Sequence, residues 1–133
     1  MNSTELQLLQ PRNLKQHNHM GLSEFLSGQA EIKNIIYNTQ DPDFDVIFSG
    51  RFAPNPVELL GGKRLSALLS NMRNIYDYVI IDTPPLGTVI DAAVMAPACD
   101  GAIMVITPGK ITNTEALEVK KQLDKSGCKI LGA

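Results

Sequence analysis

The sequence predicts an α/β fold, in which a parallel sheet carries helices on both faces. Short apolar runs that are typical of buried strands alternate with amphipathic segments that are typical of helices. Right-handed crossovers between such strands bring their carboxyl ends to one edge of the sheet. The 133 residues, 44% of them hydrophobic, are enough for one domain with a real core.

Residues 1–20 have the least regular pattern in the chain. Gln, Asn and His dominate this segment, and Pro11 interrupts its apolar cluster at 6–9. We expect it to form a poorly ordered arm or a damaged strand, and we expect residues 21–133 to form one partial α/β domain. The last apolar run, at 129–131, is short, so we expect the fold to be truncated at its C-terminal end.

The first half of the domain is predicted from periodicity and from boundary residues. Ser23 is the expected N-cap of a helix, because its hydroxyl can accept a hydrogen bond from an N–H of the first turn. Asn55 is a second N-cap, and Pro56 is a preferred first helical residue. The predicted elements are, in order, a helix at 21–28, a turn or short strand at 31–38, a strand at 44–48, helices at 57–60 and 63–74, and a strand at 78–81.

The second half is predicted from the same signals. Thr112 or Asn113 is the expected N-cap of its longest helix, and Gly127 closes that helix because glycine readily adopts the left-handed conformation. Cys99 and Cys128 form no Cys-x-x-Cys pair, and we expect them to be small core residues. The predicted elements are, in order, a helix at 89–98, a strand at 102–106, a helix at 113–125 and a strand at 129–131.

One strand leads directly into an acidic residue. The apolar run at 78–81 is followed by Asp82 and by a stiff Thr83-Pro84-Pro85 turn. A parallel sheet places this carboxylate at the edge where open α/β folds bind their ligands. Asp82 is therefore a candidate for holding Mg²⁺, directly or through water, beside the phosphates of a nucleotide. The alternative is a turn cap, because Asp in such a turn also bonds to its own backbone.

Other residues near this edge are secondary candidates. Thr83 could position water or phosphate, although capping the turn is its more ordinary role. Asp91 could lie near the phosphates, but an acid in a first helical turn commonly interacts with the helix dipole. Arg51, just past the end of a strand, is a further candidate, whereas Lys63 and Arg64 are expected to lie on a solvated face.

The sequence contains no phosphate loop to accompany Asp82. Such a loop has the pattern G-x-x-x-x-G-K-[ST], and its backbone N–H groups surround the β-phosphate. The Gly-Lys pairs at 62–63 and 109–110 are followed by Arg64 and Ile111 instead of Ser or Thr. Neither pair therefore meets the pattern.

Three tyrosines could in principle accept phosphate, namely Tyr37, Tyr76 and Tyr78. Tyr78 alternates with apolar residues, so a core role is expected for it. Tyr76 lies at the entrance of the strand and is the better candidate for modification.

Composition argues against several other functions. The formal charge of −2 gives no electrostatic basis for nucleic-acid binding. The sequence has no apolar run of about 18 residues, so no direct membrane insertion is expected, and its polar start shows no signal-peptide pattern. His17 and His19 lack an accompanying Cys or acidic cluster, so solvated histidines are expected instead of a metal site.

Several segments together resemble the bacterial tyrosine kinases of capsule and exopolysaccharide export. They are GLSEFLSG at 21–28, SGRFAPNPVELLGGKRL at 49–65, YDYVIIDTPPLGTVIDAAVMA at 76–96 and DGAIMVI at 100–106. The joint occurrence of PNPVELL, IIDTPP and the following Asp-containing helix is specific. The wider superfamily of MinD- and ParA-like P-loop ATPases shares the Asp strand but seldom the PNPxELL segment.

The resemblance implies a P-loop NTPase-like fold and an ATP- and Mg²⁺-dependent kinase that phosphorylates tyrosines on itself and on polysaccharide-assembly proteins. Asp82 matches the Walker B acid of that family. The resemblance also implies a membrane-spanning activator, the polysaccharide co-polymerase, as partner, and a homo-oligomer as a further assembly. The expected location is the cytoplasm, with any membrane association made through the partner.

The chain departs from the family in ways that bear on activity. The family's Asp-x-Asp before an Arg should fall near 6–12, where this sequence has Gln7, Gln10 and Pro11. The Walker A loop, the adenine-contacting segment and the Tyr-rich tail are not in the sequence. We therefore expect this chain alone to phosphorylate nothing. Two alternatives stay open, a non-catalytic interaction module of the export machinery and a fragment of a MinD/ParA-like ATPase.

Overall fold

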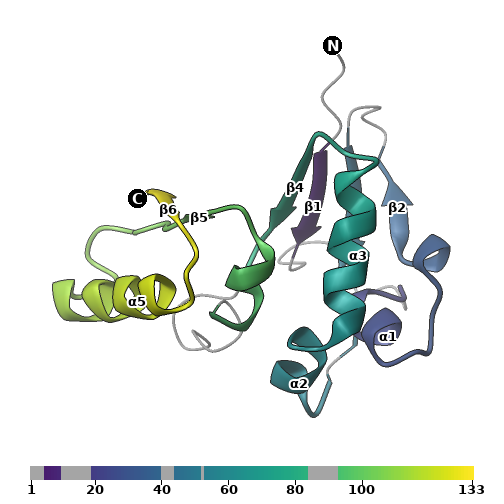
Figure 1. Cartoon of the computed structure of the whole chain (residues 1–133), viewed down its shortest axis with the longest axis horizontal. Helices are drawn as coiled ribbons and strands as arrows, with labels where there is room; N and C mark the ends of the chain where they lie inside the picture. The colour runs from purple at the N-terminus through teal and green to yellow at the C-terminus, as the bar shows by residue number, and fades with distance from the viewer. Residues whose placement is uncertain (1–4, 10–18, 40–43, 52, 84–92) are drawn as a thin grey trace. The chain divides into compact units, whose positions relative to one another are not determined.

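The structure is a computed structural model, and its contacts divide the chain into two compact units, Met1–Thr83 and Pro84–Ala133. Figure 1 shows the helices and strands of each unit. The described residues are 5–9, 19–39, 44–51, 53–83 and 93–133, and for 5–9 only the backbone is described.

The first unit is built on a four-stranded sheet with the strand order β2-β3-β1-β4. β1 (Glu5–Leu9) lies between β3 (Phe44–Phe48) and β4 (Tyr78–Ile81) and is parallel to both. β2 (Ile36–Asn38) is antiparallel to β3, so one edge of the sheet departs from the predicted parallel arrangement. The remaining strands all end at the same edge, as an α/β fold requires.

β1 lies within residues 1–20, for which the sequence predicts a poorly ordered arm or a damaged strand. The structure has a strand there, and it occupies an interior position in the sheet (Figure 1). Leu8 pairs with Ile47 on one side and with Ile81 on the other. An interior strand satisfies its backbone hydrogen bonds on both sides, and this gain outweighs the polar composition that suggested an arm.

The longest helix of the first unit buries one face. α3 (Lys63–Arg73) lies along the sheet in Figure 1 and places its buried residues at helical spacing. α2 (Pro56–Leu60) begins after Asn55, as predicted, and α1 (Leu22–Leu26) follows Gly21. A short 3₁₀ helix, η1 (Ile32–Asn34), precedes β2. The side chains with the least exposure in this unit are Ile35, Ile47, Leu65, Leu68 and Met72.

The second unit contains a parallel pair of strands, β5 (Ala102–Ile103) and β6 (Ile130–Gly132). α5 (Asn113–Lys125) connects them, and residues 93–95 with η3 (Ala96–Ala98) precede β5. β5 is shorter than the predicted strand at 102–106, and its last residue, Ile103, lies opposite Gly132 at the end of β6. The first part of the predicted helix at 89–98 lies outside the described residues.

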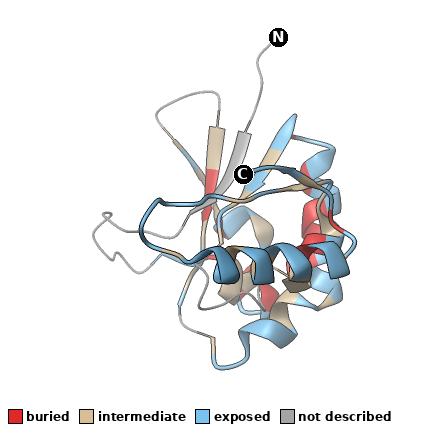
Figure 2. Cartoon of the chain, turned by 90° about the vertical axis from the view of Figure 1, so that its left-hand side faces the viewer, coloured by how far each residue is buried: buried red, intermediate tan, exposed pale blue. Residues whose placement is uncertain are grey.

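The core of this unit is small. Ala96, Leu123 and Cys128 are buried together, and Cys99 packs against them. Both cysteines are free thiols in the core, as the sequence predicts. Most of α5 is exposed, as Figure 2 shows, so the helix contributes only one narrow face to this core.

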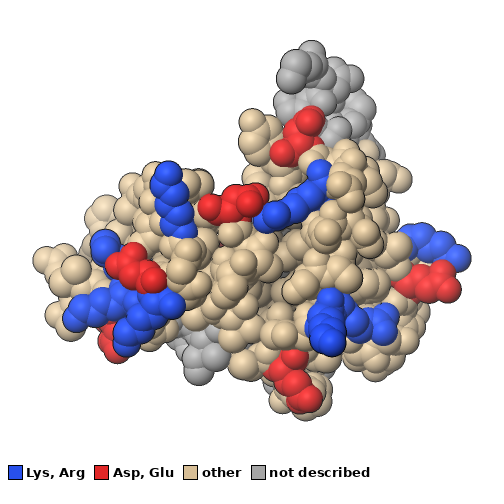
Figure 3. All heavy atoms as spheres, in the orientation of Figure 1, with Lys and Arg blue, Asp and Glu red and all other residues tan. Residues whose placement is uncertain are grey.

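The surface carries charges of both signs. On the face shown in Figure 3, Lys and Arg side chains lie among Asp and Glu side chains. No helix in the described part of the chain is long and apolar enough to cross a membrane.

Candidate functional site at the carboxyl edge of the sheet

Asp82 lies at the edge where the parallel strands of the first unit end. β4 stops at Ile81, and the next residue is Asp82, exposed and outside any helix. Leu8 is paired with both Ile47 and Ile81, so β3, β1 and β4 run in register toward this edge. The carboxylate therefore has the position in the sheet that the sequence predicts.

Of Thr83 and Asp91, the two residues predicted to act beside Asp82, only Thr83 is described. It follows Asp82 and is half-buried, so a hydroxyl and a carboxylate are adjacent in the chain at this edge. Asp91 lies outside the described residues, as does the turn that begins at Pro84. The structure thus places two of the three predicted residues together and does not bear on the third.

The turn that follows β3 lies at this edge of the sheet and is in close contact with the start of α1. The N–H of Ser23 donates to the carbonyl oxygen of Ser49 over 3.0 Å. A Cβ atom on Gly21 would lie 2.3 Å from the backbone nitrogen of Gly50, so the two backbones touch without room for a side chain. Gly50 has φ +83°, and a Cβ there would lie 2.2 Å from a carboxylate oxygen of Glu24.

Glu24 carries a buried charge at this contact, with 6% of its surface exposed. Its carboxylate accepts a hydrogen bond of 2.7 Å from the N–H of Gly21 and one of 3.0 Å from the N–H of Arg51. Burial alone would raise the pKa of Glu24, but the backbone hydrogen bonds outweigh burial and hold the pKa below its usual value. Glu24 is therefore ionised at neutral pH.

Glu24 is not among the site residues that the sequence predicts, and the predicted N-cap, Ser23, is wrong. Gly21 is the N-cap of α1, and Glu24 at the third helical position bonds back to it. The spacing between Gly21 and Glu24 is the local signal that could have indicated this pair. The bond to Arg51 spans 27 positions and leaves no local signal.

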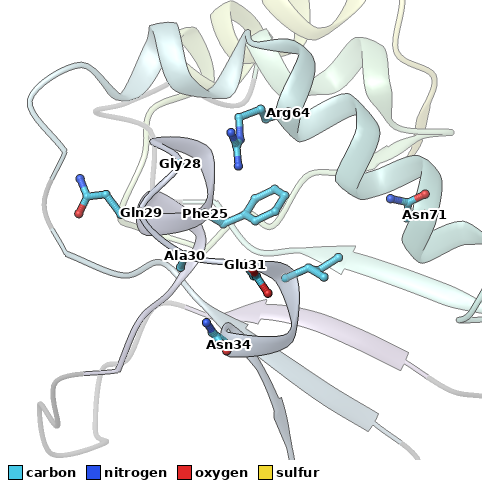
Figure 4. A pocket seen from close by; sticks show the side chains of 9 residues that line it. Phe25, Gly28, Gln29, Ala30, Glu31, Asn34, Arg64 and Asn71 are labelled. Atoms are coloured by element: carbon cyan, nitrogen blue, oxygen red, sulfur yellow. The ribbon is translucent and has the colours of Figure 1, made fainter.

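Three cations lie near the ends of the elements that form this edge. Arg51 is exposed just after β3, and Lys63 and Arg64 are exposed at the start of α3, as predicted. The guanidinium carbon of Arg64 lies 5.2 Å from the centre of the Phe25 ring, and Figure 4 shows the two side chains side by side. Arg64 is thus engaged in packing α3 against α1.

The two tyrosines beside β4 have the opposite environments from those predicted. Tyr76 is 7% exposed, and its hydroxyl donates to Asp45 over 2.5 Å. Burial, followed by the hydrogen bond and the charge of Asp45, raises the pKa of Tyr76 to about 12. Tyr78 is 61% exposed, so the predicted core role of Tyr78 is wrong, and the buried Tyr76 is the poorer candidate for modification.

The described residues contain no group of three or more His, Cys, Asp or Glu side chains that could hold a metal ion. His19 instead has its ring centroid 5.1 Å from that of Tyr37 and 5.9 Å from that of Phe48. His17 lies outside the described residues. A cation at the sheet edge would therefore combine Asp82 with oxygen ligands from water or from a phosphate.

Known families and proteins match a long stretch of the chain that includes this sheet edge. The AAA domain family matches residues 1–125. The tyrosine-protein kinase CpsD of Streptococcus agalactiae is 43% identical over 112 residues, which are 84% of this chain and 49% of CpsD. The chain thus spans about half the length of the curated relatives it matches.

Solved structures give the same picture of the fold. The kinase domain of the Escherichia coli tyrosine kinase ETK has a TM-score of 0.85 and 34% identity, covering 98% of this chain and 54% of that one. The cell-division ATPase MinD of Pyrococcus furiosus has a TM-score of 0.64 over 87% of this chain and 48% of its own. At 22% identity, the likeness to MinD shows a shared fold and no more.

Proposed function

Because the chain belongs to the AAA domain family and is homologous to bacterial tyrosine kinases, we propose that it forms part of an ATP-dependent protein-tyrosine kinase. The proposal rests on one observation, the position of Asp82 directly after β4 at the edge where the parallel strands end. Strand-terminal carboxylates at this edge are suited to hold Mg²⁺ beside nucleotide phosphates.

The residues at the edge fit a magnesium ion in part. Asp82 offers exposed carboxylate oxygens, which are the ligand type that Mg²⁺ prefers, and Thr83 adds a hydroxyl. Mg²⁺, when bound, neutralises charge on the phosphates. Asp82 would hold the ion, directly or through water, and Thr83 would orient that water or a phosphate oxygen. We propose that Asp91 is a second acid near the phosphates.

The phosphate side of the site fits less well. The sequence has no phosphate loop, so it supplies neither the ring of N–H groups nor the lysine that such sites place on the β- and γ-phosphates. We therefore propose that this chain by itself binds Mg–ATP weakly and phosphorylates no tyrosine. Activity would belong to a longer protein or to an assembly.

The biological setting follows from the family resemblance. We propose a role in capsular or exopolysaccharide biosynthesis, in the cytoplasm, with a polysaccharide co-polymerase or a related membrane activator as partner. Self-association into a homo-oligomer is part of the same proposal. Contact with the membrane would run through the partner.

A second candidate is a non-catalytic interaction module of the same export machinery. A module of this kind would need no nucleotide, and the 133 residues themselves contain no phosphate loop. Nucleotide binding separates the two candidates: the kinase part should respond to Mg–ATP, and the interaction module should not. The likeness to MinD adds no argument for an ATPase that positions other proteins.

Mg–ATP binding by the purified 133-residue chain tests the proposal. We expect weak binding that Asp82→Asn reduces about tenfold, because the substitution removes the charge that holds the cation. Asp77→Asn is the matched control, since it removes the same charge at the opposite end of β4 and should leave binding unchanged. Equal affinity of the Asp82→Asn protein and the wild type would refute the role of Asp82.

A kinase assay completes this test. With radiolabelled ATP and Mg²⁺, we expect the isolated chain to incorporate no label into tyrosine. Clear labelling of tyrosine would contradict the proposed inactivity of the isolated chain.

A further inference from the structure

Glu24 carries a charge in a place where charges are costly. A buried carboxylate loses its hydration, and the loss is tolerated only where hydrogen bonds replace the water. Glu24 is 6% exposed and meets this condition through backbone N–H groups from two distant parts of the chain. An apolar residue in this space would leave both N–H groups without an acceptor, so the carboxylate does more than fill the space.

Both oxygens of the carboxylate are used. Oε2 accepts from the N–H of Gly21 at 2.7 Å, and Oε1 accepts from the N–H of Arg51 at 3.0 Å. A carboxylate can accept both bonds, whereas the amide of glutamine accepts one and turns a donor toward the other N–H. The arrangement is therefore specific for an ionised acid.

The same contact is held at two further points. The N–H of Ser23 donates to the carbonyl oxygen of Ser49, and the backbones of Gly21 and Gly50 touch with no space for a Cβ. The start of α1 is thus attached to the turn at 49–51 by two hydrogen bonds, one to Ser49 and one from Arg51, with the glycine contact at Gly50 between them. We call this contact, formed by Gly21, Ser23, Glu24 and residues 49–51, the clasp.

The clasp lies at the sheet edge that carries Asp82. Ile47 of β3 and Ile81 of β4 both pair with Leu8, so the two strands reach the edge in register. Two strand spacings of about 4.8 Å separate β3 from β4, so their ends lie roughly 10 Å apart. Arg51 follows β3 within the clasp, and its side chain is exposed. An extended arginine side chain is longer than half of the distance between these two strand ends.

We infer that Glu24 is a positioning residue, whose bond to the Arg51 N–H fixes that backbone so that the guanidinium faces a phosphate group bound at the edge beside Asp82. This inference rests on the proposed function, because the phosphate is that of the nucleotide. A guanidinium offers several donors in one plane and suits phosphate oxygens well. Arg51 would thereby supply positive charge in a chain that has no phosphate loop.

An NMR titration of the 133-residue chain with Mg–ATP tests the inference. We expect Glu24→Gln and Arg51→Ala each to weaken binding about fivefold, since a change of this size corresponds to the net contribution of roughly one hydrogen bond. The double variant should bind no worse than Arg51→Ala, because Glu24 acts through Arg51. Glu31→Gln is the matched control, an exposed acid a few residues away that should leave binding unchanged.

Two results would overturn the inference. One is wild-type affinity in Glu24→Gln, and the other is a double variant that loses about 25-fold, the product of two independent effects. If Glu24→Gln fails to fold, Glu24→Asp replaces it, since it keeps the charge but is too short to reach both N–H groups. That variant should show the same loss and the same coupling to Arg51→Ala.

Amide exchange separates this inference from the proposed function. The Arg51 amide should be protected in the wild type without nucleotide and should exchange at least about tenfold faster in Glu24→Gln. An unprotected Arg51 amide in the wild type would refute the clasp even if Mg–ATP binds. A protected amide with no Mg–ATP binding by the wild type would refute the proposed function, and with it the phosphate role of Arg51.

Discussion

Single residues show most clearly where local pattern stops being informative. Tyr76 and Tyr78 are two positions apart, yet Tyr76 is buried and hydrogen-bonded to a carboxylate, whereas Tyr78 is exposed. The alternation of apolar residues along β4 could not reveal this, because the partner of Tyr76 is Asp45, 31 positions earlier. Asp82 was predictable because its position depends only on the strand that it follows.

The bond between Tyr76 and Asp45 leads to a prediction at this scale. We expect Tyr76→Phe to lower the free energy of unfolding by about 1–2 kcal/mol, because a partly buried carboxylate loses its hydroxyl donor. Tyr78→Phe removes a hydroxyl from an exposed ring and should change stability by less than about 0.5 kcal/mol. Urea denaturation measures both, and equal losses would contradict the assignment.

The same difference should shrink at alkaline pH. The pKa of Tyr76 is raised from its ordinary value near 10 to about 12, so the folded protein keeps a proton that the unfolded chain releases. The contribution of Tyr76 is therefore complete below about pH 10 and is lost as the pH rises toward about 12. Repeating the denaturation of wild type and Tyr76→Phe at about pH 11 should show a smaller gap.

Whole elements were predicted well where their signals were local. The strands at 44–48 and 78–81 are found as predicted, because each apolar run is bounded by polar or turn residues. α5 was predictable from Thr112 at its start and Gly127 at its end. β1 was left ambiguous because its stability comes from pairing with strands more than 30 positions away.

Helix capping gives the prediction at the scale of an element. The hydroxyl of Thr112 accepts from the N–H of Glu115, and the Glu115 carboxylate accepts from the N–H of Thr112. We expect Thr112→Ala to destabilise α5 by about 1 kcal/mol. Thr114→Ala, an exposed substitution inside the helix, should not destabilise it. Amide exchange within α5 measures both, and equal protection in the two variants would refute the cap.

On the scale of the whole molecule, both units leave apolar strand residues exposed. Ile80 of β4 is 44% exposed, Ile103 of β5 is 71% exposed and Leu131 of β6 is 61% exposed. Parallel strands are normally covered on both faces, and an isolated two-stranded sheet is marginally stable. The family match across residues 1–125 includes both units, yet the chain spans only about half of its curated relatives.

This exposure predicts the behaviour of the isolated chain. We expect it to self-associate with rising concentration or to melt with low cooperativity, because exposed apolar surface favours association. Sedimentation velocity over a concentration series, combined with thermal melting, measures both properties. A strictly monomeric protein with one sharp transition would contradict the expectation.

The interior position of β1 has a consequence for how the sheet is made during translation. β1 leaves the ribosome before both of its partner strands, and one of them, β4, is completed only when residue 81 has been synthesised. A nascent chain shorter than this has one side of β1 without the partner found in the finished sheet. Such long-range pairing slows folding and exposes the growing polypeptide to aggregation, so this stage is where a chaperone would matter most.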